Sequence, residues 1–115
     1  MYVSRSQRDE IPSGTLDLLI LKTLARHGEL HGFEIADSIQ STSEDILQVE
    51  EGSLYPALQR MLLKGWLKGE WGKTQENRRA RYYTLTSDGR KQLQNEMDRY
   101  GRVSNAIARV LEAAS

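Results

Sequence analysis

The feature that most constrains the fold is a long amphipathic segment near the C-terminal end of the chain. Between residues 87 and 113, apolar side chains recur at spacings of three and four residues, which predicts one continuous helix with a single apolar face. Thr86, Ser87 and Asp88 supply the capping and first-turn residues that favour a helix start there. At 1.5 Å per residue, about 26 residues reach roughly 40 Å, which is long for a domain built from a chain of 115 residues.

The spacing of this apolar stripe is close to that of a coiled-coil seam. The stripe could cover the helix's own domain, but its length favours pairing with the same helix of a second copy. The sequence therefore predicts a homodimer that is held together through the terminal helix. The residues expected at the dimer interface are Leu93, Met97, Tyr100, Val103, Ile107 and Val110.

A polar arm over residues 1–12 is followed by two shorter helical patterns. Ser13 or Thr15 offers an N-cap for the first helix, and Gly28 suits its C-terminal end. A second helix is expected over residues 31–40, followed by a loop at residues 41–43, where Ser, Thr and Ser succeed one another.

A third helix is expected to begin near residue 52 and to end near residue 65. Its apolar residues are spaced by four, seven and eight positions from Leu54, which indicates one buried face. With Ser53 as N-cap, Pro56 would lie in the first turn, where its missing N–H costs little. The opposite face carries small and hydrogen-bonding residues, namely Gly52, Ser53, Pro56, Gln59 and Arg60.

A β-hairpin is expected next, with strands over residues 66–71 and 79–85 and a polar turn over residues 72–78. Its tip and second arm gather positive charge in a chain whose formal net charge is zero. Residues 60–91 hold nine Lys and Arg against three acids, whereas residues 29–51 hold seven acids and no Lys or Arg. The basic residues expected to act together are Lys73, Arg78, Arg79 and Arg81.

Four aromatic residues of this hairpin are expected to serve mainly its packing. Tyr82 and Tyr83 alternate along a strand, so one of the two should point inward. Trp66 and Trp71 are expected to wedge the hairpin onto the core rather than to stack on a base.

Several function classes find no support in the sequence. The chain has no cysteine, which excludes disulfides and thiolate metal sites. No nucleophile–base arrangement or paired carboxylates emerge. His27 and His31 have a spacing that can bind zinc on a helix, but Gly28 interrupts that helix. We therefore expect no catalytic residues, no metal, no cofactor and no enzymatic activity. The N-terminus is polar and the longest apolar run is far too short for a membrane span, so a cytoplasmic protein is expected.

The order helix, helix, helix, hairpin, helix predicts a fold that is mainly α with a small β-hairpin. It is the order of a winged helix-turn-helix over residues 13–86, followed by a dimerisation helix over residues 87–115. In that architecture the third helix enters the DNA major groove and the hairpin lies over the neighbouring backbone. Gln59 suits adenine and Arg60 suits guanine. The basic hairpin, which is the wing of this architecture, would neutralise phosphates and release condensed counterions.

Three stretches of the sequence together resemble the PadR-like family of transcriptional regulators. They read GTLDLLILKTLARHGELHGFEIADSI, VEEGSLYPALQRMLLKGWLKGEW and NRRARYYTLTSDGRKQL. The resemblance covers residues 13 to 111, and its most specific parts are Glu51 to Leu58 and Arg81 to Thr86. The single terminal helix resembles the short subfamily.

The resemblance implies a dimeric winged-helix DNA binder, usually a repressor, that is released from DNA by a small-molecule effector in some members. It implies recognition through the helix that holds Ser53, Tyr55, Pro56 and Gln59, and backbone contacts by the wing and by the start of the second helix. Members often have Tyr where this chain has Phe33, which removes one hydroxyl from that contact. Drug-binding members use a tryptophan on the last helix, whereas both tryptophans here lie in the hairpin.

The leading interpretation is a sequence-specific DNA-binding regulator, a homodimer on double-stranded DNA with a near-palindromic operator. The alternative is a winged-helix protein-interaction module without DNA binding, for which the acidic segment over residues 29–51 is the best feature. The residues expected to contact DNA are Phe33, Ser53, Tyr55, Pro56, Gln59, Arg60, Lys64, Lys73, Arg78, Arg79 and Arg81.

Overall fold

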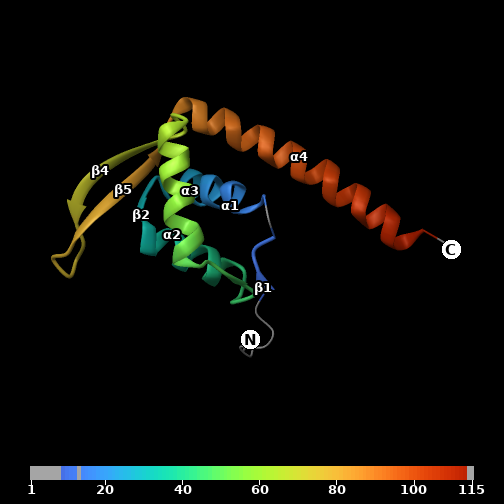
Figure 1. The fold of residues 1–115 in the computed structure, drawn as a ribbon, viewed down its shortest axis with the longest axis horizontal. Coiled ribbons are helices and arrows are strands. Elements are labelled where there is room, and N and C mark those ends of the chain that lie inside the picture. The colour runs from blue at the N-terminus through green and yellow to red at the C-terminus, as the bar shows by residue number, and fades with distance from the viewer. Residues whose placement is uncertain (1–8, 13, 114–115) are drawn as a thin grey trace.

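A computed structural model describes residues 9–12 and 14–113 of the chain. Within them, three helices and a hairpin form a winged helix-turn-helix, from which a long terminal helix extends (Figure 1). The predicted fold class, mainly α with a small β-hairpin, is confirmed. The elements are, in chain order, β1 (Asp9–Glu10), α1 (Leu16–His27), β2 (Glu29–His31), α2 (Gly32–Thr42), β3 (Leu47–Gln48), α3 (Glu51–Leu63), β4 (Leu67–Lys73), β5 (Arg79–Leu85) and α4 (Ser87–Glu112).

The sheet has one more strand than the hairpin that the sequence predicts. β2 pairs antiparallel with β5, so the strand order is β2-β5-β4. Three residues between two helices are too few to show a strand periodicity, and β2 forms because β5 offers its free edge. At the end of the expected N-terminal arm, Asp9 and Glu10 form β1, which pairs in parallel with β3. Residues 1–8 of that arm, and Ser13, one of the two N-cap candidates for the first helix, lie outside the described residues.

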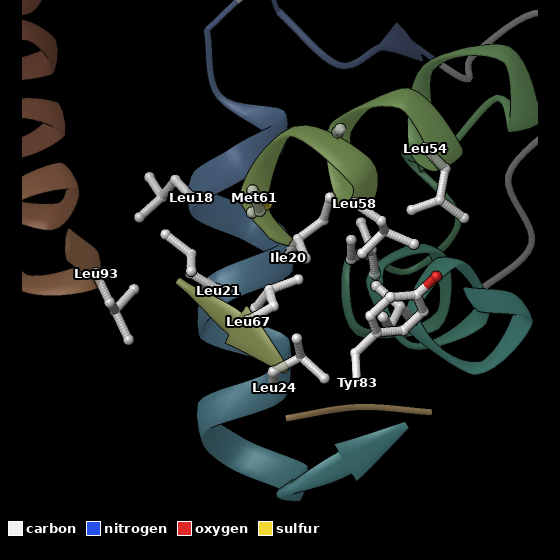
Figure 2. Packing of buried hydrophobic residues seen from close by; sticks show 13 residues of the cluster. Leu18, Ile20, Leu21, Leu24, Leu54, Leu58, Met61, Leu67, Tyr83 and Leu93 are labelled. Atoms are coloured by element: carbon white, nitrogen blue, oxygen red, sulfur yellow. The ribbon is translucent and has the colours of Figure 1, made fainter. Parts of the chain in front are cut away.

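The core lies between the first three helices and the base of the sheet (Figure 2). α1 is the central element, and the buried faces of α2 and α3 close over it as the periodicities predict. Tyr83 is the member of the tyrosine pair that points inward, which confirms that only one of the two does so. The side chains that are almost completely buried are Ile20, Leu21, Leu24, Ile35, Leu54, Leu58 and Met61.

The start of α3 differs from the prediction. The N-cap is Glu50, which follows β3 in an extended conformation, and its carbonyl oxygen accepts hydrogen bonds from the N–H groups of Ser53 and Leu54 at 3.0 and 2.9 Å. Ser53 is therefore the third residue of the helix and not its cap. Pro56 lies in the second turn, where its missing N–H leaves the Gly52 carbonyl without its helical donor. Gly52 is exposed, so water can hydrogen-bond to that carbonyl instead.

Two further element boundaries differ from the prediction. α2 continues through Thr42, so its last turn occupies part of the expected loop. β4 runs to Lys73 because its pairing with β5 continues up to Arg79, which leaves a shorter turn over residues 74–78. Asn77 adopts a positive φ of 62° in that turn, a conformation that asparagine tolerates better than most residues.

The direction of α4 is fixed at its first turn. The Thr86 hydroxyl accepts a hydrogen bond from the Gly89 N–H at 3.0 Å and donates one to the Gly65 carbonyl at 2.6 Å. Gly89 packs directly on the Trp66 carbonyl oxygen, with which any side chain at that position would collide. Of the residues of α4, only Leu93, with 8% of its surface exposed, belongs to the core cluster. Beyond it α4 runs away from the other helices (Figure 1), and the molecule reaches 58 Å along its longest axis.

Candidate nucleic-acid interface

α3 presents one polar face to solvent, opposite its buried residues. Ser53, Pro56 and Gln59 are all exposed on this face. Tyr55 is half-exposed, with 47% of its surface accessible. These are the residues that an inserted helix would offer to the edges of DNA bases.

Tyr55 is held against the start of α2 by a close approach at Gly32. A Cβ atom at Gly32 would lie 2.8 Å from the Tyr55 ring carbon Cε1 and 2.9 Å from its hydroxyl oxygen. Only glycine leaves room for the ring at this distance. Gly32 therefore couples the first turn of α2 to the exposed face of α3.

The first turn of α2 is exposed beside this contact. The His31 N–H donates to the Glu34 Oε1 atom at 3.1 Å, which secures the helix start. Phe33, with 69% of its surface exposed, projects from the first turn. Free N–H groups at a helix start carry partial positive charge and favour anions such as phosphate. The position can provide that contact through its backbone, although Phe33 has no hydroxyl to add.

The hairpin carries its charge on the face that continues outward from the core. The register pairs Leu67 with Leu85 in the core and Gly69 with Tyr83 next to it. Because side chains alternate along a strand, the same face then carries Trp71 opposite Arg81 and Lys73 opposite Arg79. Arg78 follows in the turn and is exposed.

The prediction for the two tryptophans holds for only one of them. Trp66 is partly buried and packs against the core, as expected. The prediction is wrong for Trp71, which is 60% exposed. β4 has left the core at that residue, so the indole has no apolar surface to cover. The Arg79 guanidinium carbon lies instead 4.2 Å from the centre of its ring.

These parts surround one open groove of about 990 Å³. The hairpin forms one wall, and the start of α2 with Tyr55 forms the other. Four cationic side chains line it against two carboxylates, those of Glu34 and Glu76. Of the predicted DNA-contacting residues, the groove brings together Phe33, Tyr55, Lys73, Arg78, Arg79 and Arg81.

The other five predicted contact residues do not line the groove. Ser53, Pro56 and Gln59 lie on the exposed face of α3, and the remaining two are engaged within the chain. The Arg60 guanidinium forms an ion pair with the Asp17 carboxylate of α1. Lys64 caps the far end of α3, and its Nζ atom lies 4.7 Å from the centre of the Trp66 ring. Neither side chain lines the groove.

Sequence reasoning missed two glycines that shape this site. Gly32 gives room to Tyr55, and Gly69 gives room to Arg81, whose Nε atom would collide with a side chain there. A glycine inside a predicted strand is a known sign of a close approach, so Gly69 could have been found. Gly32 could not, because its contact joins two separate helices.

Tyr83 is a buried titratable residue in the lining of the groove. Burial raises the pKa of its phenol, and the nearby Arg81 charge opposes part of that rise. The phenol is therefore neutral and contributes no negative charge beneath the cationic wall.

The apolar stripe of α4 is mostly exposed. Leu93 packs in the core of its own chain, whereas Met97, Tyr100 and Val103 are between 41% and 53% exposed. Ile107 and Val110 follow at 55% and 76%. A second hollow of about 320 Å³ lies between the start of α1 and this part of α4, lined in part by Leu18, Tyr100 and Val103.

The structure also allows a search for metal sites and for membrane-spanning helices. Among the residues that the structure describes, no group of three His, Asp or Glu side chains could share a metal ion. In the same part of the chain no helix combines the length and the apolar character that crossing a membrane requires.

Known proteins resemble the chain in sequence and in fold. A transcriptional regulator from Clostridium thermocellum is 26% identical, with a TM-score of 0.76 over 84% of this chain and 92% of that chain. A PadR-like transcriptional regulator from Bacillus cereus is 27% identical, with a TM-score of 0.72 over 88% and 95%. Bacillus subtilis PadR, solved with operator DNA, shares the fold at 24% identity, with a TM-score of 0.65 over 76% of this chain and 48% of that one.

A sequence model of the transcriptional regulator PadR-like family matches residues 20–95. The match runs from the first helix through the hairpin into the terminal helix, and so includes every wall of the groove. Since it spans well over half of the chain, this protein belongs to the PadR-like family of transcriptional regulators.

Proposed function

We propose that the chain is a sequence-specific DNA-binding repressor that works as a homodimer and is released from its operator by a small-molecule effector. The observation that carries the DNA-binding part is the groove between the hairpin and α2. It joins the start of α2, Tyr55 from the exposed face of α3, and a cationic wall. Such a role places the protein with the nucleoid in the cytoplasm.

In this proposal α3 enters the major groove, and the hairpin and α2 contact the backbone on either side of it. Gln59 reads base edges, with Ser53, Tyr55 and Pro56 beside it. Arg60 holds α3 to α1 through Asp17 and reaches a base only if that ion pair opens. The backbone contacts are assigned to the first turn of α2 at Phe33 and to Lys64, Lys73, Arg78, Arg79 and Arg81.

The exposed apolar stripe of α4 supports the homodimer. A row of half-exposed apolar residues on a projecting helix is the kind of surface that pairs with a second copy. A two-fold dimer would present two copies of α3 about one DNA turn apart, roughly 34 Å. The operator would then be near-palindromic.

The hollow between α1 and α4 is where we place the effector. It adjoins the proposed dimer seam, so a ligand bound there could change how the two DNA-binding units are held. A ligand releases DNA only if it binds the DNA-free conformation better. A phenolic acid is the first probe, and in a titration of the protein–DNA complex it is expected to restore free DNA.

The rival function is a protein-interaction module that has lost DNA binding. Its support is the acidic surface over residues 29–51, where Glu29, Asp37, Glu44, Glu50 and Glu51 are exposed. These side chains would repel DNA wherever they faced it. A positively charged protein partner would fit them instead.

An electrophoretic mobility shift separates the two functions. The purified protein is expected to retard the DNA upstream of its own gene at low ionic strength, and to retain that preference when random DNA competes. Specific affinity should exceed non-specific affinity by at least about 10³-fold. If the protein retards neither DNA at low salt, the DNA-binding proposal is wrong and the interaction module takes its place.

A further inference from the structure

The exposed indole of Trp71 lies in the middle of the charged hairpin face. This face follows a regular order from the core to the turn, since apolar pairs come first and cationic residues last. Trp71 stands between the two groups, opposite Arg81 and one pair inside Arg79. It lines the groove together with both arginines.

Trp71 contributes little to the core. It is 60% exposed, whereas Trp66, at the base of the hairpin, packs against the core cluster. Both arginines of the groove face approach its ring. The Arg79 guanidinium carbon lies 4.2 Å from the ring centre, and that of Arg81 lies at 5.9 Å. A cation at these distances over an indole face is attracted by the ring quadrupole.

Arg81 occupies its place at some cost to the free protein. Its side chain crosses Gly69, the residue that leaves room for it. Its Nε atom is enclosed and has no hydrogen-bond partner among the described residues. An enclosed donor without a partner destabilises a fold, so the stability of the hairpin does not explain why the side chain is held there.

We propose that Trp71 is a positioning residue for DNA binding. Its indole face orders the guanidinium groups of Arg79 and Arg81 before DNA arrives. The inference rests on the proposed function. An arginine side chain that extends into solvent without contacts loses much rotamer freedom when it binds a phosphate. A side chain that is already stacked on an aromatic ring loses less. Preorganisation of this kind increases affinity without adding a contact.

The closing experiment compares four variants with the wild type on the DNA upstream of the gene. They are Trp71→Leu, which keeps apolar bulk but removes the π face, Trp71→Phe, which restores a smaller π face, Arg79→Ala, and the double variant Trp71→Leu with Arg79→Ala. Thermal unfolding of each checks that the fold is kept. The measured quantities are Kd and its dependence on salt.

Trp71→Leu is expected to weaken binding by about three- to ten-fold, and Trp71→Phe should recover part of that loss. The salt slope of Trp71→Leu should match the wild type, because both arginines still reach phosphates. Arg79→Ala should instead reduce the slope by about 0.9. The double variant should lose less than the product of the two single losses, since part of the effect of Trp71 is exerted through Arg79.

Two results would overturn the inference. The first is wild-type affinity in Trp71→Leu, and the second is a double variant whose loss equals that product, because Trp71 would then not act through Arg79. NMR of the free protein gives a readout that needs no DNA. The Arg79 Nε–Hε signal should be shifted by the indole ring current, and the shift should vanish in Trp71→Leu. If the wild type binds no DNA, the proposed function fails; if the wild type binds and Trp71→Leu binds equally, only this inference fails.

Discussion

At the scale of single residues, the shape of the candidate interface depends on two glycines. Gly32 admits the Tyr55 ring, and Gly69 admits Arg81. Each glycine therefore controls the position of a larger residue that faces the groove. The sequence names the larger residues readily, but the space that they need is a property of the packed structure.

Gly32→Ala is expected to weaken DNA binding by about 1 kcal/mol, roughly five-fold in Kd, with little loss of stability. The new methyl group would displace the Tyr55 ring, which is half-exposed and can rotate outward. Alanine is also the better helix former, which offsets part of the strain. Fluorescence anisotropy gives the affinity and thermal unfolding gives the stability.

The control for this prediction is the same substitution in a Tyr55→Ala background. If the steric conflict with the ring is the cause, Gly32→Ala should have almost no further effect there. An equal loss in both backgrounds would show that Gly32 acts through something other than Tyr55.

Gln59→Ala is expected to change sequence preference rather than overall affinity. Gln59 is exposed on the free face of α3, and a bidentate base contact contributes about 1–3 kcal/mol of discrimination. Binding to a panel of single-base operator variants should lose its preference at one position in each half-site. A uniform loss across the panel would remove Gln59 from base reading.

At the scale of elements, the hairpin links the core to the candidate DNA-binding groove. The register shows that one face carries apolar residues at its base and cationic residues toward its turn. A single hairpin thereby joins the core and faces the groove.

Arg78→Ala combined with Arg79→Ala should weaken binding to specific and random DNA alike. Removing one phosphate-binding side chain should flatten the slope of log K against log salt by about 0.9, so removing both should flatten it by about 1.8. Lys68→Ala is the matched control, because Lys68 is an exposed cation on the opposite face of β4. Unchanged binding of the double variant at every salt concentration would exclude the wing from DNA binding.

At the scale of the whole molecule, α4 determines how two copies could be arranged. It leaves the winged domain from a first turn that Gly89 and Thr86 fix against the Gly65–Trp66 connection. After Leu93 its apolar stripe has little of its own chain to pack against. A second copy would bury that stripe, and the fixed first turn would then set the separation of the two recognition helices.

Ile107→Asp is expected to produce a monomer without changing the fold. Ile107 is 55% exposed in the single chain, so the substitution leaves the core intact, but in a dimer it would place a charge in the seam of both copies. Loss of about 1.5–3 kcal/mol of apolar burial per copy weakens dimerisation by at least about 10²-fold. Analytical ultracentrifugation measures this change.

Asn105→Asp adds the same charge to the opposite side of α4 and should leave the proposed dimer intact. DNA affinity should fall with dimerisation in Ile107→Asp and stay unchanged in the control. A wild-type protein that remains monomeric at micromolar concentration would contradict the proposed dimer.

The sequence by itself determined the features that depend on local periodicity and capping. Leu54, Leu58 and Met61 mark a buried helix face wherever they occur at that spacing, and Thr86 before an amphipathic run marks a helix start. The four helices, the hairpin and the cationic residues of the wing follow from such patterns. The family resemblance followed from motifs of the same local kind.

Only the tertiary structure decided which of these residues meet. The edge of β5 turned three residues into β2, and the continuation of β3 into α3 moved the helix start ahead of Ser53. Trp71 was left outside the core, where Arg79 stacks on it, and Arg60 was drawn to Asp17 on another helix. Each of these outcomes depends on a contact between segments far apart in the chain or on where a strand leaves the core, and a local pattern contains neither.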